Sequence, residues 1–309
     1  MAATRPTSTG VEPLVRLWPG VPDLHALGAA TFADLLGESG ALEGESEDGL
    51  VSRREGRSVL RYPLPGTVHR AGERRPLPRG AGTGFVYLTR WTGGSLGECA
   101  RARLTAPRSS SLAARAWNLL CHLREHGVGT AEPLAMGEDR SPLFATRSFL
   151  ATRELDGMLT LPEYLEQNGD APSRRRLAQA LGLFVSRIAG ARVALPRLAP
   201  EHVFVSRTVG GEGCAANQLQ EFQARRTHGT SLPVRLLPEL ALASVEGGRL
   251  VARDSLELRL ELLGRLDAGL VAGAAIAPRD RLRAVHHAVG PRPDRDALRR
   301  HLLQLTRSR

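Results

Sequence analysis

The sequence contains no lysine, few aromatic residues and no long apolar segment. All 42 basic residues among its 309 are arginines, and aromatic residues make up 4% of the chain. Any mechanism that needs a lysine side chain is therefore excluded, and few rings remain on which nucleic-acid bases could stack. The longest apolar stretch, Gly269–Ala277, is far shorter than the roughly 20 residues that span a bilayer.

Cysteine is also scarce. Cys99, Cys121 and Cys214 are odd in number and have no C-x-x-C spacing, which argues against a disulfide framework or a cysteine zinc site. The first ten residues lack the apolar core of a secretory signal. These features predict a cytoplasmic protein, and the net charge of +10 favours anionic partners such as phosphates or acidic lipid rather than a dedicated nucleic-acid site.

The chain changes character near its middle, from strand-like to helical patterns. At roughly 150 residues per domain the length suggests two domains or lobes, so we expect an α+β fold with a strand-rich N-lobe and a helical C-lobe. The expected divisions are an N-terminal extension with a short helix (1–47), an N-lobe (48–154) and a C-lobe (155–309) with an inserted loop (206–231). The main predicted elements are a hairpin over 50–62, strands over 85–91 and 143–152, and helices over 111–126, 161–166, 173–189, 254–266 and 294–304.

One short motif suggests a metal. His122-Leu-Arg-Glu-His126 matches the H-x-x-E-H pattern of some metalloproteases and would place both imidazoles on one helical face. The match covers three residues, and no further carboxylate ligand with its own helix is evident. We therefore expect an exposed helix end and no metal site here.

Longer segments carry a family resemblance. Phe85–Trp91, Ala114–Glu138 and Arg147–Leu155 follow one another in a characteristic order, and Leu195–Val205 (LPRLAPEHVFV) is similar to a catalytic loop usually written HRDLYPEHIFV. With the later segments Val251–Asp254 and Pro278–Arg283, the chain resembles the lipopolysaccharide kinase (Kdo/WaaP) family from about residue 48 to 305. The resemblance implies a protein-kinase-like fold and phosphoryl transfer from ATP, with Mg²⁺, to a core sugar of lipopolysaccharide.

Such phosphoryl transfer depends on a set of charged groups, and this chain departs from the family at each of them except one. The strand lysine that should hold the phosphates falls on Thr89, and the helix glutamate that should pair with it falls on Ala116. The catalytic aspartate falls on Arg197. His202 matches the histidine on the metal side of the site. The metal aspartate falls on Pro238, next to Glu239, the one nearby carboxylate.

The amino-acid composition of two stretches supports these replacements independently of how the chain is aligned with the family. No aspartate occurs between Ala171 and Arg253, and no glutamate occurs between Cys99 and Arg124. Arg90, beside Thr89, is no easy substitute for the lysine because neighbouring strand residues point to opposite faces. The loss of a general base alone costs roughly 10²–10⁴ in rate, so the sequence predicts a pseudokinase with doubtful binding of ATP and Mg²⁺.

Three functions follow from these observations. The first is a catalytically degenerate protein with a binding or regulatory role in envelope glycolipid metabolism, whose partners are the lipopolysaccharide core glycolipid or an active kinase relative. The second is an active kinase for a Kdo or heptose residue that uses displaced groups such as Arg90, His202 and Glu239. The third is a basic module peripheral to the anionic inner membrane, suggested by the arginines of 70–79 and 174–176.

Overall fold

The computed structural model describes residues 13–19, 21–27, 29, 31–36, 50–54, 56–64, 84–91, 111–139, 147–206, 237–270 and 277–290. The predicted helix over 294–304, the arginines of 70–79, residues 207–231 of the predicted insertion, Cys99 and Cys214 lie outside these ranges. The chain forms two compact units. The first comprises residues 1–118 and 132–154, and the second comprises 119–131 and 155–309.

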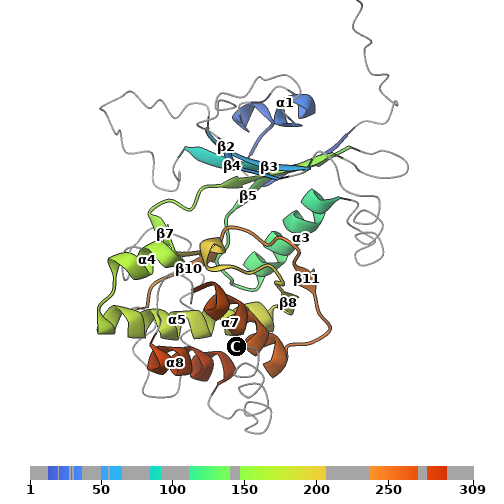
Figure 1. Ribbon diagram of the computed structural model, residues 1–309. Helices are drawn as coiled ribbons and strands as arrows, with labels where there is room; N and C mark the ends of the chain where they lie inside the picture. The colour runs from blue at the N-terminus through green and yellow to red at the C-terminus, as the bar shows by residue number, and fades with distance from the viewer. Residues whose placement is uncertain are drawn as a thin grey trace, which may run out of the picture. The chain divides into compact units, whose positions relative to one another are not determined.

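The first unit is built on an antiparallel sheet of six strands in the order β1-β5-β6-β4-β3-β2 (Figure 1). The strands are β1 (Leu14–Leu17), β2 (Leu50–Arg54), β3 (Arg57–Pro63), β4 (Phe85–Trp91), β5 (Pro133–Glu138) and β6 (Ser148–Arg153). The predicted hairpin is confirmed, with Gly56 at φ 69° in its turn, a backbone conformation that glycine adopts without strain. The predicted strand over 85–91 is confirmed as well.

The N-terminal segment is part of this first unit. β1 pairs with β5 through all four of its residues, and the predicted short helix forms as a 3₁₀ turn η1 (His25–Leu27) and a helix α1 (Phe32–Leu36). Leu27, Leu35 and Leu36 are buried against Leu88 and Phe149 of the sheet. The described part of the predicted N-terminal extension therefore adds a strand to the sheet and covers one of its faces. The sequence did not predict this role, because elements this short show no clear hydrophobic period.

The helix α3 (Leu112–Glu125) confirms the predicted helix over 111–126. It begins behind Ser111, whose hydroxyl accepts from the N–H of Ala114 at 3.0 Å, and it ends at Gly127 with φ 71°. The chain passes from the first unit to the second within this helix, at Asn118.

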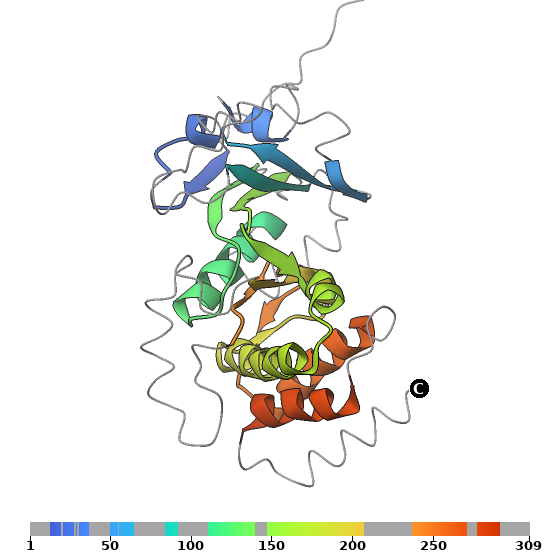
Figure 2. The same ribbon diagram turned by 90° about the vertical axis from the view of Figure 1, so that its left-hand side faces the viewer.

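The second unit is mainly helical, with short strand pairs. Its strands are β7 (Met158–Thr160), β8 (Val193–Ala194), β9 (Val203–Ser206), β10 (Leu240–Leu242) and β11 (Arg249–Leu250), and its helices are α4 (Leu161–Gln167), α5 (Ala171–Gly190), the 3₁₀ turn η3 (Pro200–His202), α7 (Leu256–Leu270) and α8 (Pro278–Val289). β9 lies between β10 and β7, and β11 pairs with β8. Figure 2 shows α5 lying along α8, which allows Gly182 to approach the backbone of Ala284 closely.

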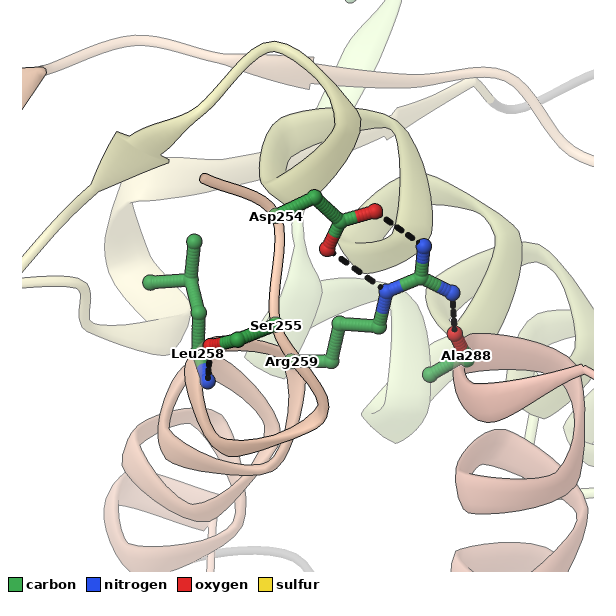
Figure 3. Close-up of polar contacts among 5 residues, drawn as sticks. All are labelled: Asp254, Ser255, Leu258, Arg259 and Ala288. Atoms are coloured by element: carbon green, nitrogen blue, oxygen red, sulfur yellow. Dashed lines mark hydrogen bonds and ion pairs between the residues drawn. The ribbon is translucent and has the colours of Figure 1, made fainter. Parts of the chain in front are cut away.

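A polar cluster joins the start of α7 to the end of α8 (Figure 3). Arg259 binds both carboxylate oxygens of Asp254, and its Nη1 donates to the carbonyl of Ala288 at 2.7 Å. The hydroxyl of Ser255 accepts from the N–H of Leu258 at 3.1 Å and caps α7. Among the described residues, no helix combines the length and apolar character needed to cross a membrane.

Candidate functional site

Thr89, predicted at the position of the family's lysine, lies in the middle of β4 opposite Val59 of β3 and Leu150 of β6. It is half-buried, as are Phe85, Tyr87 and Trp91, whereas Val86, Leu88 and Arg90 are buried. This alternation places Thr89 on the sheet face opposite the core that α1 covers. Its hydroxyl carries no charge, so it cannot neutralise a phosphate as a lysine would.

Arg90 points to the other face of the sheet, as the strand alternation predicts. It is buried, and its Nε donates to the carbonyl of Leu35 at 2.6 Å while its Nη2 donates to that of Asp34 at 3.3 Å. These are carbonyls of the last turn of α1, which have no partner within so short a helix. Arg90 therefore holds α1 on the sheet and is not placed to stand in for the missing lysine.

Ala116, predicted at the position of the family's helix glutamate, is half-buried in α3. Its methyl group has no polar atom with which to orient a cation. The next residue, Trp117, is buried and meets Trp18 edge-on, with ring centroids 5.9 Å apart. This part of α3 is used for packing.

The segment that resembles the catalytic loop follows β8 and leads through η3 into β9. Arg197 is exposed in the turn after β8, and its Nη1 lies 2.5 Å from Oε1 of Glu246. The side chain of Arg197 is 62% exposed and that of Glu246 is 20% exposed. Arg197, predicted at the position of the family's general base, is thus paired with a carboxylate that sequence motifs did not identify.

The turn that carries Glu246 follows β10 directly and needs its two glycines. The N–H of Gly248 donates to the carbonyl of Val245 at 2.9 Å, and Gly247 has φ 69°. A Cβ on Gly248 would lie 2.8 Å from that carbonyl oxygen and 3.0 Å from Leu195. Glycine at 247 and 248 therefore allows the turn to lie against the catalytic-loop segment, and a Gly-Gly pair after a short apolar run is the sequence signal that could have found it.

His202 and Glu239 lie at opposite ends of the β9–β10 pair. His202 accepts a backbone hydrogen bond from Ala243 at 2.9 Å, whereas Glu239 exchanges two hydrogen bonds of 2.9 Å with Ser206. His202 is the last residue of η3 and Ser206 is the last residue of β9, so the backbone positions of His202 and Glu239 are separated by the length of β9. Pro238 is buried and precedes Glu239, beyond the same end of the strand pair.

Glu239 is exposed, but neighbouring protein removes part of its hydration and raises the pKa of its carboxyl group. Over the described ranges, no three histidine, cysteine, aspartate or glutamate side chains gather closely enough to hold a metal ion. The residues at the expected positions therefore do not fit the way in which kinases hold Mg²⁺ and ATP, which requires a strand lysine and two metal-binding side chains.

The two histidines of the H-x-x-E-H motif are engaged by the backbone. Nε2 of His122 donates to the carbonyl of Ala191 at 2.7 Å, and Nδ1 of His126 donates to the carbonyl of His122 at 2.8 Å. Their rings are in contact, with centroids 4.2 Å apart and planes tilted by 40°. In this arrangement the histidines anchor the end of α3.

Comparisons with known proteins agree with this fold. Residues 71–218 match the lipopolysaccharide kinase (Kdo/WaaP) family. The chain is 30% identical over 180 residues to the lipopolysaccharide core heptose(I) kinase WaaP of Pseudomonas aeruginosa, a match that covers 58% of this chain and 54% of the relative. The chain thus spans about half the length of that relative. Among solved structures, WaaP in complex with acyl carrier protein matches with a TM-score of 0.60 and 18% identity, over 96% of this chain and 97% of that one.

The protein is an α+β protein with the kinase-like fold of this structural neighbour. Its sequence is similar to the lipopolysaccharide kinase (Kdo/WaaP) family over residues 71–218, in agreement with the segments that carry the resemblance. Thr89, Ala116 and Arg197, which the sequence predicts at the family's charged positions, lie on β4, on α3 and in the segment between β8 and η3. None of the three is the residue type that the family carries there.

Proposed function

We propose that the protein is a pseudokinase of the lipopolysaccharide kinase family that binds an anionic, phosphorylated sugar without transferring phosphate to it. The ion pair of Arg197 and Glu246 carries the proposal. A guanidinium stays protonated at all physiological pH values and has no acceptor atom, so Arg197 cannot take the proton of an attacking hydroxyl. We infer that Ser244 and Glu246, rather than Pro238 and Glu239, occupy the place of the family's metal-binding segment, because their turn lies beside Arg197.

The same arginine is suited to binding an anion. Its planar guanidinium is largely exposed and can form two parallel hydrogen bonds to a phosphate or carboxylate. Glu246 competes for those donors, and it repels an incoming anion. The pair therefore works as a weak, exchangeable anion site, and the net charge of +10 raises the local concentration of anionic ligands.

The kinase relative and the neighbour in complex with acyl carrier protein suggest where the protein acts. We propose that it works in the cytoplasm, peripheral to the inner membrane, in envelope glycolipid metabolism. Its ligand is then the phosphorylated core of lipopolysaccharide, and its protein partner is an active kinase of the same pathway or an acyl carrier protein.

The test combines a phosphotransfer assay with a binding assay. The full chain is incubated with radiolabelled ATP, Mg²⁺ and lipopolysaccharide core acceptors, and binding of phosphorylated core oligosaccharide is measured by calorimetry. We expect no transfer above the protein-free rate, and we expect binding that Arg197→Ala weakens at least tenfold. Glu246→Gln should tighten binding, because it removes the competing carboxylate. Arg265→Ala is the matched control, since Arg265 forms a similar exposed pair with Glu261 on α7.

The second function is that of an active kinase with displaced catalytic residues. Glu246 is a better candidate than Glu239 for the displaced carboxylate, because Glu246 contacts Arg197. If Glu246 served as the base or held Mg²⁺, the wild-type chain would transfer phosphate and Glu246→Gln would abolish the transfer. The same substitution thus has opposite consequences under the two functions. Transfer that depends on Glu246 would overturn the pseudokinase proposal.

Membrane binding through arginines is the third function. In the described part of the chain its evidence is the first turns of α5, where Arg175 is exposed while Arg174 and Arg176 are half-buried. The test is binding to vesicles with 30% anionic lipid while the salt concentration rises from 0.05 to 0.3 M. Membrane binding through arginines is supported if the binding weakens over this range, in which the Debye length falls below about 10 Å. Binding that is lost with Arg175→Ala would identify the surface.

A further inference from the structure

A second polar cluster lies in the first unit, on the sheet face that carries Thr89. Arg61 of β3 stands opposite Tyr87 of β4 in the strand register, and residues opposite each other share a face. Phe85 and Glu154 complete the cluster, and a backbone hydrogen bond of 3.1 Å from Glu154 to Phe85 fixes the carboxylate beside β4. These four residues, Arg61, Phe85, Tyr87 and Glu154, are called the strand-face cluster below.

The cluster holds Arg61 from two sides. Its Nε and Nη2 donate to the two carboxylate oxygens of Glu154 at 2.8 and 3.1 Å, and its guanidinium carbon lies 3.6 Å from the centre of the Phe85 ring. The hydroxyl of Tyr87 lies 3.4 Å from the same carboxylate. The Glu154 side chain is 17% exposed, so the ion pair is screened from water on that side.

The surroundings alter the ionisation of these groups in a consistent way. The hydrogen bond that Arg61 donates to the Glu154 carboxylate raises the pKa of Arg61. Partial burial, followed by the charge of Glu154, raises the pKa of Tyr87. The guanidinium therefore stays charged and the phenol stays protonated, so the bidentate pair is stable over the whole physiological range of pH.

We propose that the strand-face cluster keeps a nucleobase off this face of the sheet. The proposal rests on the pseudokinase function, in which Thr89 marks where the phosphates of a nucleotide lie in active relatives. Side chains two apart on a strand are separated by about 7 Å, so a base attached to phosphates at Thr89 would extend along the face over Tyr87 and Arg61. The guanidinium already covers the Phe85 ring, the flat surface on which a base would stack.

A base could bind only after the Arg61–Glu154 pair opened and left a partly desolvated carboxylate without its cation. Exclusion by this route is independent of the missing lysine and of Arg197. The protein would thus reject ATP through the shape of the face as well as through the absence of catalytic charges.

The experiment measures binding of ADP, and of tripolyphosphate as a probe without a base, to the full chain by calorimetry. The variants are Tyr87→Ala, Arg61→Ser with Tyr87→Ala, and Glu154→Gln, which keeps the shape but weakens the hold on Arg61. We expect no ADP binding to the wild type at millimolar concentration. In the three variants of the strand-face cluster, here called the opened variants, the affinity for ADP should rise at least tenfold, and the affinity for tripolyphosphate should not change. Arg53→Ser, at an exposed arginine of β2, is the matched control and should gain nothing.

Two results would overturn the proposal. One is wild-type affinity for ADP equal to that of the opened variants. The other is an absence of gain, or an equal gain for tripolyphosphate, in variants whose circular dichroism and melting temperature show a folded chain. Wild-type ADP binding without phosphotransfer would refute this inference and leave the pseudokinase function standing, whereas phosphotransfer would refute both.

Discussion

Arg90 and Arg197 both occupy or adjoin positions at which the sequence predicts a lost catalytic charge, but the two units use these arginines differently. In the first unit Arg90 is buried and donates to two carbonyls of α1. In the second unit Arg197 is exposed and pairs with a single carboxylate. The comparison teaches that residue type and position do not assign a role. The face of the strand and the available acceptors decide whether an arginine stabilises the fold or remains accessible to a ligand.

The strongest test of this comparison is Arg90→Ala. It removes the guanidinium donors to two carbonyls of α1, and we expect the free energy of unfolding to fall by about 3 kcal/mol, measured by urea denaturation. Arg90→Lys should recover only part of the loss, because one ammonium cannot reproduce the forked geometry. A loss no larger than that of a surface arginine would show that Arg90 does not anchor α1.

Arg259 tests whether an arginine that spans two helices behaves like Arg90. Arg259→Ala removes the pair with Asp254 and the bond to the carbonyl of Ala288 (Figure 3), and we expect a loss of about 2 kcal/mol in the free energy of unfolding. Arg265→Ala, at an exposed pair within α7, should cost about 0.5 kcal/mol or less. Equal costs would mean that the carbonyl bond contributes nothing.

Tyr62 tests the polar environment around Arg90 itself. Its buried hydroxyl has no hydrogen-bond partner in the described structure, and burial raises the pKa of its phenol while the charge of Arg90 partly opposes the shift. Tyr62→Phe should raise the free energy of unfolding at pH 7 by about 1 kcal/mol. Tyr87→Phe, which removes a hydroxyl with a partner, is the control and should give no gain.

The alkaline behaviour of Tyr62 follows from the sign of its shift. In the folded chain the phenol stays neutral when the unfolded chain ionises near pH 10. Its contribution to stability is therefore complete below about pH 10 and is lost as the pH rises through that value. Tyr62→Phe should lessen the fall in stability between pH 9 and 11, and an unchanged slope would contradict the burial of this hydroxyl.

The smallest expected effect on stability is that of Arg197→Ala, at most about 0.5 kcal/mol, because its pair is largely exposed. For ligand binding we expect the opposite order of the two variants. Arg197→Ala should weaken oligosaccharide binding at least tenfold, whereas Arg90→Ala should not alter the affinity of the folded fraction. A denaturation curve and a titration on the same two variants check this. Similar profiles for both variants would remove the distinction between the two arginines.

Long periodic segments made much of the fold predictable. The sequence located β4 by its alternation and α3, α5 and α7 by their apolar spacing, and the opposite orientations of Thr89 and Arg90 follow from strand geometry alone. Strands of two to four residues such as β1, β8 and β11 are too short to show a period.

The candidate site was harder to predict because it depends on strand register. Residues 207–239 separate β9 from β10 in sequence, so spacing could not reveal the register in which the two strands pair. The pairing of Ala243 with His202 places Glu246, and not Glu239, near Arg197. Family positions supplied Arg197 and His202, but the partner of Arg197 required the folded chain.

The four residues of β1 have a consequence for how this edge of the sheet is protected from pairing with other molecules. β1 occupies one edge of the first unit's sheet, and without it the six residues of β5 would present unpaired N–H and C=O groups to solvent. Open edges of this kind are templates for strand addition between molecules. A chain shortened beyond Leu17 would therefore be expected to assemble edge to edge, and the N-terminal segment protects the protein from this form of aggregation.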